Sequence, residues 1–216
     1  DLGLFTADPD IVNDVSDVFN YLTGYSNQKE FRGMIVAPVQ LRQRLKELIE
    51  REIEHAQAGR PARLMIKANA LTDDQMIRLL YRAAQAGVSM DLMVRGICCL
   101  RPGVPGISDN IRVRSIVGRF LEHHRIYWFG NDGAPELFCS SADWLERNLL
   151  RRVETGFPVL DPELAQRVHD EALANYLADN LNAWELQSDG SYRKLAPQEG
   201  AAPHSAQVAL LARICG

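Results

Sequence analysis

The stretch RLMIKANALTDDQMIRLLYRAAQAGVSMDLMV, residues 63–94, decides the fold class. It begins with a short apolar run, 63–67, and ends with a second one, 88–94, in which nearly every residue is apolar. Between them, Thr72-Asp73-Asp74 can cap a helix that Gly87 closes. A strand without polar alternation is buried on both faces, as in the centre of a mostly parallel sheet. The stretch therefore predicts a strand–helix–strand unit of an α/β protein.

The residues before this stretch repeat the same order of elements. An apolar strand over 34–37 ends at Pro38, and a long charged helix over 41–58 follows it. A further helix from Pro9, with apolar side chains at helical spacing, precedes both. Strand, helix, strand, helix and strand in this order predict right-handed crossovers in a layered α/β architecture.

The pattern changes after Leu100. A loop rich in Pro and Gly is followed by strand-like runs, an amphipathic helix over 162–178, a hairpin around Ser188-Asp189-Gly190 and a C-terminal helix over 206–214. The strand-like runs cover 111–117, 125–129, 137–140 and 152–157, and the hairpin strands cover 183–186 and 192–195. With 216 residues, the chain is expected to form one domain or one and a half.

The charge distribution separates the middle of the chain from the rest. The net charge of −4 argues against nucleic-acid binding, but residues 95–152 carry nine basic side chains against six acidic ones, and all nine are Arg. Arginine presents a planar, permanently charged fork suited to phosphate oxygens, although surface ion pairs explain such a set equally well. No stretch approaches the roughly 18 to 20 apolar residues of a membrane span. The four cysteines, in apolar surroundings, are expected to be buried free thiols in a reducing cytoplasm.

His123 is the most informative of the five histidines. It stands at the entrance of a predicted strand, two residues before Arg125. An imidazole there can accept a phosphoryl group or transfer a proton, but it can equally be a structural residue. His55 and His169, within predicted helices among charged residues, are expected on the surface. The histidines and cysteines form no zinc-site pattern.

Two further positions could carry chemistry. Arg95 directly follows the strand 88–94, at the edge where ligands of open α/β sheets gather, and a buried arginine there needs an anionic partner. Ser141 and Asp143 follow another predicted strand. They can bind phosphate, orient a histidine or pair with an arginine, and either can instead cap a helical turn.

Five motifs, in order, resemble the polyphosphate kinase family. They are DLGLFTADP (1–9), VRGIC (94–98), GISDNI (106–111), GRFLEH (118–123) and SSADW (140–144). The first resembles the segment that leaves the family's first catalytic domain, and the others resemble its second. The resemblance implies an α/β fold with a phospholipase D-like mixed sheet flanked by helices, one half of a two-domain catalytic unit. It implies a helical end of the preceding domain over 1–30, the catalytic domain over 31–180 and a hairpin and helix extension over 181–216.

The same resemblance implies an activity. Polyphosphate kinases reversibly move the terminal phosphate of ATP onto inorganic polyphosphate, with Mg²⁺, through a phosphohistidine. By the resemblance, Arg95 and His123 contact the nucleotide phosphates, and His123 is the catalytic residue, as proton donor or phosphate contact. Arg125, Ser141 and Asp143 complete the expected ATP- and phosphate-binding set. The histidine that becomes phosphorylated is expected upstream of this chain and the Mg²⁺ ligands outside it, so the isolated fragment is expected to be inactive.

The resemblance also implies partners and leaves two other functions open. The expected partners are ATP or ADP and inorganic polyphosphate, without nucleic acid, in a cytoplasmic homo-oligomer that can associate peripherally with membranes. The first alternative is half of a phospholipase D-like phosphodiesterase. It is disfavoured because Arg125 stands where the H-x-K motif of that superfamily has lysine. The second is a non-catalytic domain for phosphate binding or oligomerisation. His124 has no assigned role.

Overall fold

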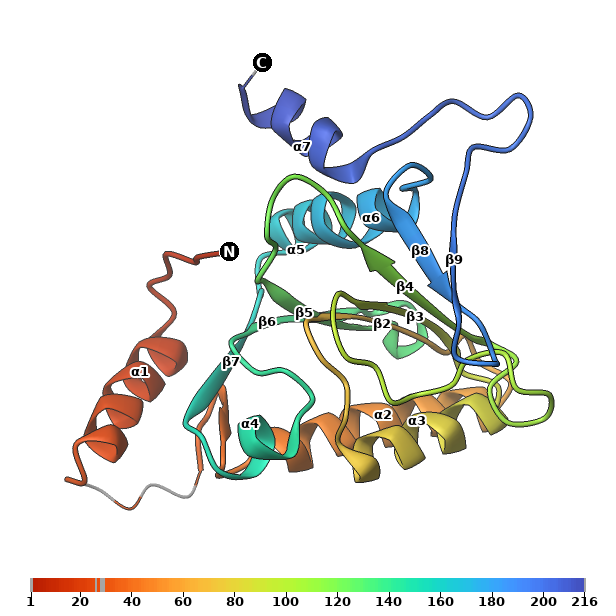
Figure 1. The fold of residues 1–216 in the computed structure, drawn as a ribbon. Coiled ribbons are helices and arrows are strands. Elements are labelled where there is room, and N and C mark those ends of the chain that lie inside the picture. The colour runs from red at the N-terminus through yellow and green to blue at the C-terminus, as the bar shows by residue number, and fades with distance from the viewer. Residues whose placement is uncertain (1, 26, 28–29, 216) are drawn as a thin grey trace.

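The computed structural model describes residues 2–25, 27 and 30–215, so that Asp1, Ser26, Gln28, Lys29 and Gly216 lie outside the described residues. In the described part, nine strands form one mixed sheet in the order β1-β7-β6-β5-β2-β3-β4-β8-β9 (Figure 1). The strands are β1 (Ile35–Ala37), β2 (Arg63–Ala68), β3 (Ser89–Val94), β4 (Ile111–Ile116), β5 (Arg125–Phe129), β6 (Glu136–Ser140), β7 (Glu154–Pro158), β8 (Ala183–Leu186) and β9 (Tyr192–Lys194).

Helices flank this sheet, as the sequence predicts. They are α1 (Pro9–Leu22), α2 (Leu41–Gln57), α3 (Asp74–Gln85), α4 (Glu146–Leu150), α5 (Pro162–His169), α6 (Asn175–Leu177) and α7 (Ala206–Cys215). A 3₁₀ turn covers Asn131–Gly133, and a π-helical turn, Asp170–Ala174, joins α5 to α6. The cap expected for the helix that starts after Asp73 is present at α3, because the Asp73 carboxylate accepts the backbone N–H of Met76 at 2.9 Å.

The direction of the strands corrects one expectation. The described strands pair in parallel only at β2–β3 and β3–β4, and every other pairing is antiparallel. β1 is not the parallel neighbour of β2 but pairs antiparallel with β7 at the edge of the sheet. The place beside β2 belongs to β5, a longer strand with four of its five residues buried. The larger apolar area of β5 accounts for its central position.

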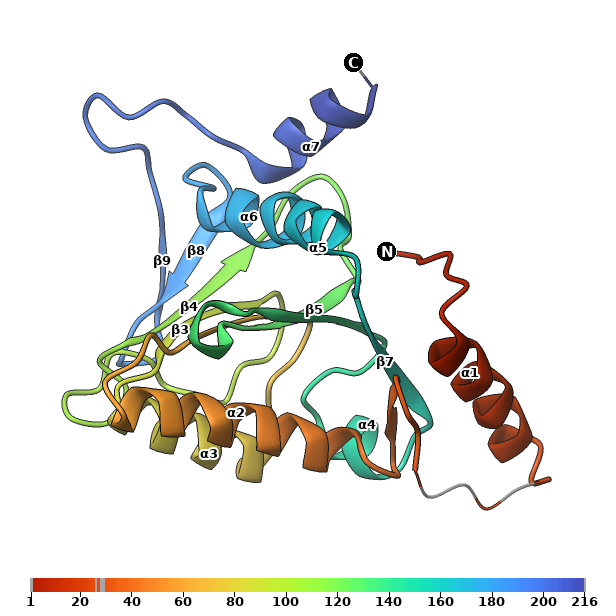
Figure 2. The same ribbon diagram turned by 180° about the vertical axis from the view of Figure 1, so that it is seen from behind.

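Two layers of helices bury the two faces of the sheet (Figure 2). Side chains alternate along a strand. In β2, Leu64 and Ile66 therefore join the core under α2 and α3, whereas Met65 faces the core under α5 and α6. The central strands are covered on both faces, which explains why the sequence of 63–94 carries no polar alternation.

The helix expected over 162–178 is present but not uniform. α5, the π-helical turn and α6 follow one another without a break, and the wide turn carries the buried Leu173. α4 lies where the capping interpretation of Ser141 and Asp143 places a helical turn. Ser141 and Asp143 do not cap it, because its N-cap is Leu145, so the capping interpretation of these residues is wrong.

The ends of the chain attach in different ways. The buried Asp14 of α1 accepts the backbone N–H groups of Arg32, Gly33 and Met34 at 3.0, 2.7 and 2.8 Å, which ties α1 to the segment before β1. The hairpin β8–β9 extends the same sheet beside β4, so residue 180 is not a boundary of the sheet. Among the described helices, none has the length and apolar character needed to cross a bilayer.

Two expectations about burial are corrected. All four cysteines are free thiols, but Cys99 and Cys215 are exposed, so the expectation that all are buried is wrong. His55 is buried rather than on the surface, with its Nε2 3.2 Å from the side-chain oxygen of Asn131. Neighbouring charges misled the prediction, because they do not show which side of α2 is buried: Glu52 of the same helix is buried as well.

Candidate active site

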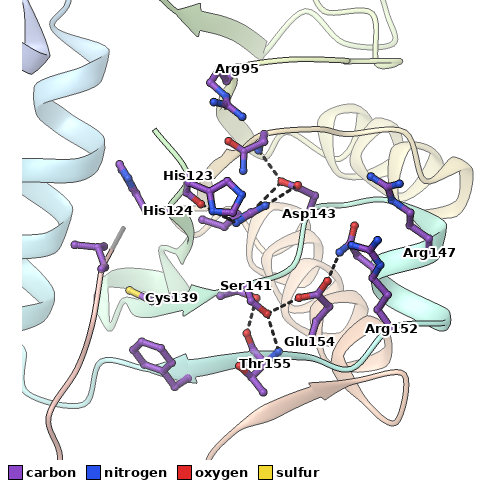
Figure 3. Close-up of a pocket in the computed structure, with 16 residues that line it drawn as sticks. Arg95, His123, His124, Cys139, Ser141, Asp143, Arg147, Arg152, Glu154 and Thr155 are labelled. Carbon is purple, nitrogen blue, oxygen red and sulfur yellow. Dashed lines mark hydrogen bonds and ion pairs between the residues drawn. The ribbon is translucent and has the colours of Figure 1, made fainter. Parts of the chain in front are cut away.

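A cavity of about 660 Å³ opens at one edge of the sheet (Figure 3). Its walls contain every residue that the sequence singled out for phosphate chemistry. These are Arg95, His123, Arg125, Ser141 and Asp143. The cavity is also lined by Leu2, Asn69, His124, Cys139, Ser140, Arg147, Asn148, Arg152, Glu154, Thr155 and Phe157.

Strand direction brings these residues together. β2 and β3 are parallel, with Ala68 opposite Val94, so the residues that follow them, Asn69 and Arg95, lie at the same edge. β5 runs antiparallel to β2 and therefore begins at that edge. β6 is antiparallel to β5, with Ser140 opposite Arg125, and therefore ends there. The site thus occupies the carboxyl edge of the parallel strands, where ligands bind in open α/β sheets.

A buried ion pair forms the floor beneath His123. The Arg125 guanidinium donates to both carboxylate oxygens of Asp143, at 3.2 and 2.9 Å. Asp143 also accepts the backbone N–H groups of Asn69 at 2.7 Å and Ala70 at 3.3 Å. Arg125 and Asp143 are less than a tenth exposed, so their charges satisfy each other within a network of further hydrogen bonds. The expectation that Asp143 pairs with an arginine is confirmed.

Arg125 also sets the orientation of His123. Its NH1 donates to the His123 carbonyl at 2.7 Å and lies 3.2 Å from His123 Nδ1. A guanidinium can only donate, so Nδ1 accepts and the imidazole proton resides on Nε2. His123 therefore has its Nδ1 lone pair engaged by a fixed cation and an N–H on the other side of the ring.

The cavity carries more positive charge than its own carboxylates neutralise. Within the described residues, Arg95, Arg147 and Arg152 have no carboxylate partner, and the Arg95 NH1 atom is buried without a hydrogen-bond partner. Arg95 follows β3, Arg147 belongs to α4 and Arg152 follows α4, so that Arg95 lies on one side of the cavity and the other two lie on another (Figure 3). A buried guanidinium without an acceptor is costly, so this arrangement favours an anion with several oxygens as ligand.

Ser141 lies in the cavity wall with its hydroxyl already engaged. Its Oγ donates to Glu154 at 2.5 Å and accepts the backbone N–H of Thr155 at 3.0 Å. The second oxygen of Glu154 accepts from the side-chain amide of Asn148. Ser141 therefore forms part of the cavity wall. Its hydroxyl can donate to a phosphate only when its hydrogen bond to Glu154 is broken.

His124 turns away from His123 and packs inward. Its ring lies 6.0 Å from that of Tyr176 in an edge-on arrangement. Burial, with the nearby charge of Lys67, lowers the pKa of His124 to about 3, so the ring is neutral in the folded protein. His123 is exposed in the cavity, whereas the half-buried His124 lines the cavity and packs against Tyr176.

Sequence reasoning missed several members of the site. Asn69 follows β2 as Arg95 follows β3, so the rule that singled out Arg95 could have found it. Glu154 and Thr155 had no such signal, since β7 reaches the site only through its pairing with β6.

The described residues contain no group of three or more His, Cys, Asp or Glu arranged to hold a metal ion. The two carboxylates in the cavity are engaged by Arg125 and backbone N–H groups and by Ser141 and Asn148. Their oxygens therefore do not fit a Mg²⁺ site, which needs carboxylates available as ligands.

Comparison with known families identifies the region to which the chain corresponds. Residues 34–207 match the family model "Polyphosphate kinase C-terminal domain 2". The polyphosphate kinase of Xylella fastidiosa is 58% identical over 211 residues, which cover 98% of this chain and 30% of that protein. The polyphosphate kinase of Thermosynechococcus vestitus is 55% identical over 213 residues, covering 99% and 29%. The chain thus spans about 30% of the length of these curated relatives.

Solved structures agree in fold. The crystal structure of polyphosphate kinase from Porphyromonas gingivalis superimposes with a TM-score of 0.93 at 42% identity, over 98% of this chain and 32% of that one. A phospholipase D family member, Nuc from Salmonella typhimurium, gives a TM-score of 0.50 at 13% identity, over 72% of this chain and 97% of that one. The second likeness concerns the fold alone, and together the two confirm the phospholipase D-like α/β class.

Proposed function

The chain belongs to the polyphosphate kinase family, and from this membership we propose that it forms one half of an active site that reversibly transfers the terminal phosphate of ATP to inorganic polyphosphate. The observation that carries the proposal is the cavity itself. It unites His123 with three arginines that lack carboxylate partners in the described residues. A polyanion such as ATP or polyphosphate offers the oxygens that these guanidinium groups need.

His123 is suited to contact a phosphate rather than to attack it. A nucleophilic imidazole needs a free lone pair on the attacking nitrogen. The lone pair of Nδ1 faces the Arg125 guanidinium, and Nε2 carries the proton. We therefore assign His123 the role of hydrogen-bond donor, through Nε2, to a phosphoryl oxygen. The proposed phosphohistidine then forms on a histidine in the part of the full-length protein that this chain does not span.

The arginines have distinct places in the proposed reaction. Arg95, at the end of β3 and partly buried, is placed to hold a phosphate deep in the cavity. Arg147 and Arg152 are exposed at its rim and can guide a longer polyanion. Mg²⁺ supplies charge neutralisation to phosphates in such transfers, but no residue of this chain is assigned to it.

The outer surface of α1 supports a composite site. Val12, Val15, Phe19 and Leu22 recur at helical spacing on this helix and are all exposed, Phe19 by 64%. An apolar stripe of this kind marks a surface that packs against further protein. In the full-length protein, the remaining catalytic half is proposed to lie against this side.

The test uses the full-length enzyme and the synthesis of polyphosphate from ATP. His123→Ala is expected to lower kcat about 100-fold or more, because a contact to the transferred phosphoryl group is lost. Arg95→Ala is expected to lower kcat/KM for ATP by about 100-fold. The matched control is Arg78→Ala, an exposed arginine of α3 outside the cavity, which should keep wild-type rates. Full activity of His123→Ala in a folded protein would refute the proposed role.

A phosphodiesterase half is the competing function within the same fold. It predicts hydrolysis of bis(p-nitrophenyl) phosphate by the full-length protein, independent of ATP. The Arg125–Asp143 pair argues against it, because the position of the superfamily's lysine is taken up by a structural ion pair. Such hydrolysis, lost in His123→Ala, would favour the phosphodiesterase.

A further inference from the structure

We propose that Gln207, the second residue of α7, is a positioning residue that fixes the segment 117–124 and through it the approach of His123 to phosphate. The inference rests on the proposed function, since it concerns the residue that contacts the phosphoryl group there. It gives the C-terminal helix, for which the sequence suggested no role, a part in the active site.

Gln207 binds the backbone of the segment at two points. Its side-chain oxygen accepts the N–H of Phe120 at 2.9 Å, and its amide nitrogen donates to the carbonyl of the same residue at 2.9 Å. The amide nitrogen also lies 2.8 Å from a carboxylate oxygen of Glu122. Gln207 is only 7% exposed, so these bonds are shielded from competing water.

The segment needs such support because it lacks secondary structure. Among the backbone–backbone hydrogen bonds that the described chain forms outside its helices and strands, residues 118–122 take part in none, and Val117 contributes one, to the carbonyl of Asn182. Side chains must therefore hold the segment in place. Gln207 satisfies both backbone groups of Phe120, as a neighbouring strand would do.

Gly118 fits the same contact from the other side. A Cβ atom at this position would lie 2.3 Å from the side-chain oxygen of Gln207 and 2.6 Å from its Cδ. The amide of Gln207 cannot move aside without breaking its three hydrogen bonds. A glycine is therefore required for the backbone to approach this close.

The residues on either side of His123 are anchored to the core. Glu122 accepts from Lys67 Nζ at 2.5 Å, and that ammonium lies 3.0 Å from the ring centre of Tyr176. Burial lowers the pKa of Lys67 to about 8, against the raising effect of Glu122. Burial also tends to raise the pKa of Glu122, but the ion pair and hydrogen bonds lower it overall, so both groups are charged at neutral pH. With His124 also packed on Tyr176, His123 is left facing the cavity.

The start of α7 is itself fixed. Asp179, buried after α6, accepts the N–H of Ala206 at 2.8 Å, and the side-chain amide of Asn175 donates to the carbonyl of Ala206 at 3.0 Å. Gln207 therefore extends from a rigid attachment point to the segment 117–124. The contact joins residues 87 positions apart in the chain.

The first experiment measures polyphosphate synthesis by the full-length enzyme with Gln207→Ala. We expect kcat to fall about 10- to 100-fold, because a shift of His123 by a fraction of an ångström relative to the phosphate lowers the rate by this much. KM for ATP should change by less than about threefold, since the unpaired arginines are untouched. Gln57→Ala, an exposed glutamine of α2, is the matched control and should behave as wild type.

The second experiment is a double-mutant cycle with Gly118→Ala. Alone, Gly118→Ala should lower kcat as Gln207→Ala does, since the new methyl group displaces the side-chain amide of Gln207. In the Gln207→Ala background it should cost little more, because the space is then empty. Additive losses, or a wild-type kcat for both single variants, would overturn the inference even if Gln207→Ala alone proved unstable.

His123→Ala separates this inference from the proposed function. An inactive His123→Ala together with a fully active Gln207→Ala removes the positioning role and leaves the function standing. A fully active His123→Ala removes both. A lower kcat of Gln207→Ala can also arise simply because less of the protein is folded. In that case Gln207→Asn, or a lower assay temperature, restores kcat in proportion to the folded fraction. This result would show a purely structural role and would also overturn the inference.

Discussion

Arg125 distributes the hydrogen-bond donors of one guanidinium over three acceptors: the Asp143 carboxylate, the His123 carbonyl and His123 Nδ1. A lysine offers a single point charge and cannot span these directions. At this position the chain therefore differs from the H-x-K motif of the phospholipase D superfamily, in which a lysine stands in place of Arg125. Arg125 is part of the support beneath the cavity, and the cavity's positive charge without a carboxylate partner in the described residues comes from Arg95, Arg147 and Arg152.

His124 leads to a prediction about acid stability. Its pKa is about 3 in the folded protein against an ordinary value of 6.5, mainly because it is buried. Below pH 6.5 His124 binds a proton in the unfolded chain but not in the folded one, so the free energy of unfolding decreases as the pH is lowered. At about 1.4 kcal/mol per pH unit, the loss reaches up to about 2 kcal/mol at pH 5.

His124→Phe keeps an aromatic ring against Tyr176 and removes the titration. Urea denaturation at pH 7 and at pH 5 should show a smaller loss for this variant than for wild type, by up to about 2 kcal/mol. Val208→Ala, at an exposed position of α7, should keep the wild-type difference. Equal pH dependence in wild type and His124→Phe would contradict the assignment.

At the scale of elements, the site depends on antiparallel strands meeting the end of a parallel pair. β5 and β6 carry His123, Arg125 and Ser141 to the edge where β2 and β3 end. β7 then brings Glu154 beside Ser141. β1 is the edge strand on this side of the sheet, and it pairs with β7 over a short length.

The β1–β7 contact leads to a prediction at Gly156, which lies opposite Ile35. A Cβ at Gly156 would lie 2.6 Å from Ile35 Cγ1, so Gly156→Ala should cost about 1–3 kcal/mol through overpacking. Urea denaturation checks the value. Gly3→Ala, with nothing within 4 Å of the new methyl group, should cost almost nothing. In an Ile35→Ala background, which lacks the Cγ1 atom, Gly156→Ala should cost less; an equal cost there would exclude this clash as the cause.

At the scale of the whole molecule, the chain presents a cavity with positive charge and an apolar stripe on α1. Both fit a protein that is completed by further sequence, as its share of about 30% of its curated relatives indicates. The shape of the site follows from this sheet, whereas the proposed chemistry requires both halves.

The chain of 216 residues on its own is therefore expected to bind polyphosphate without turnover. Fluorescence anisotropy with labelled polyphosphate should show affinity that weakens about tenfold between about 50 and 200 mM salt. Replacing Arg95, Arg147 and Arg152 by Ala should abolish most of it, whereas replacing the paired Arg78 and Arg193 should not. ATP-dependent synthesis by this chain alone would contradict the missing-nucleophile proposal.

The sequence alone predicted most of the elements and singled out residues that the structure places around one cavity. The spacing of apolar residues is local, so helices such as α2 and α3 and strands such as β2 and β3 were predictable. The motif residues Arg95, His123 and Asp143 were also correctly singled out as members of one cavity.

Tertiary structure alone decided how these parts combine. Apolar spacing does not specify a strand's neighbour, and so the antiparallel place of β1, the arrival of Glu154 and the burial of His55 were not predictable. The same holds for Gln207, whose backbone partner lies 87 residues away. Such contacts depend on which buried surfaces fit together once the chain has closed, and no local pattern encodes that choice.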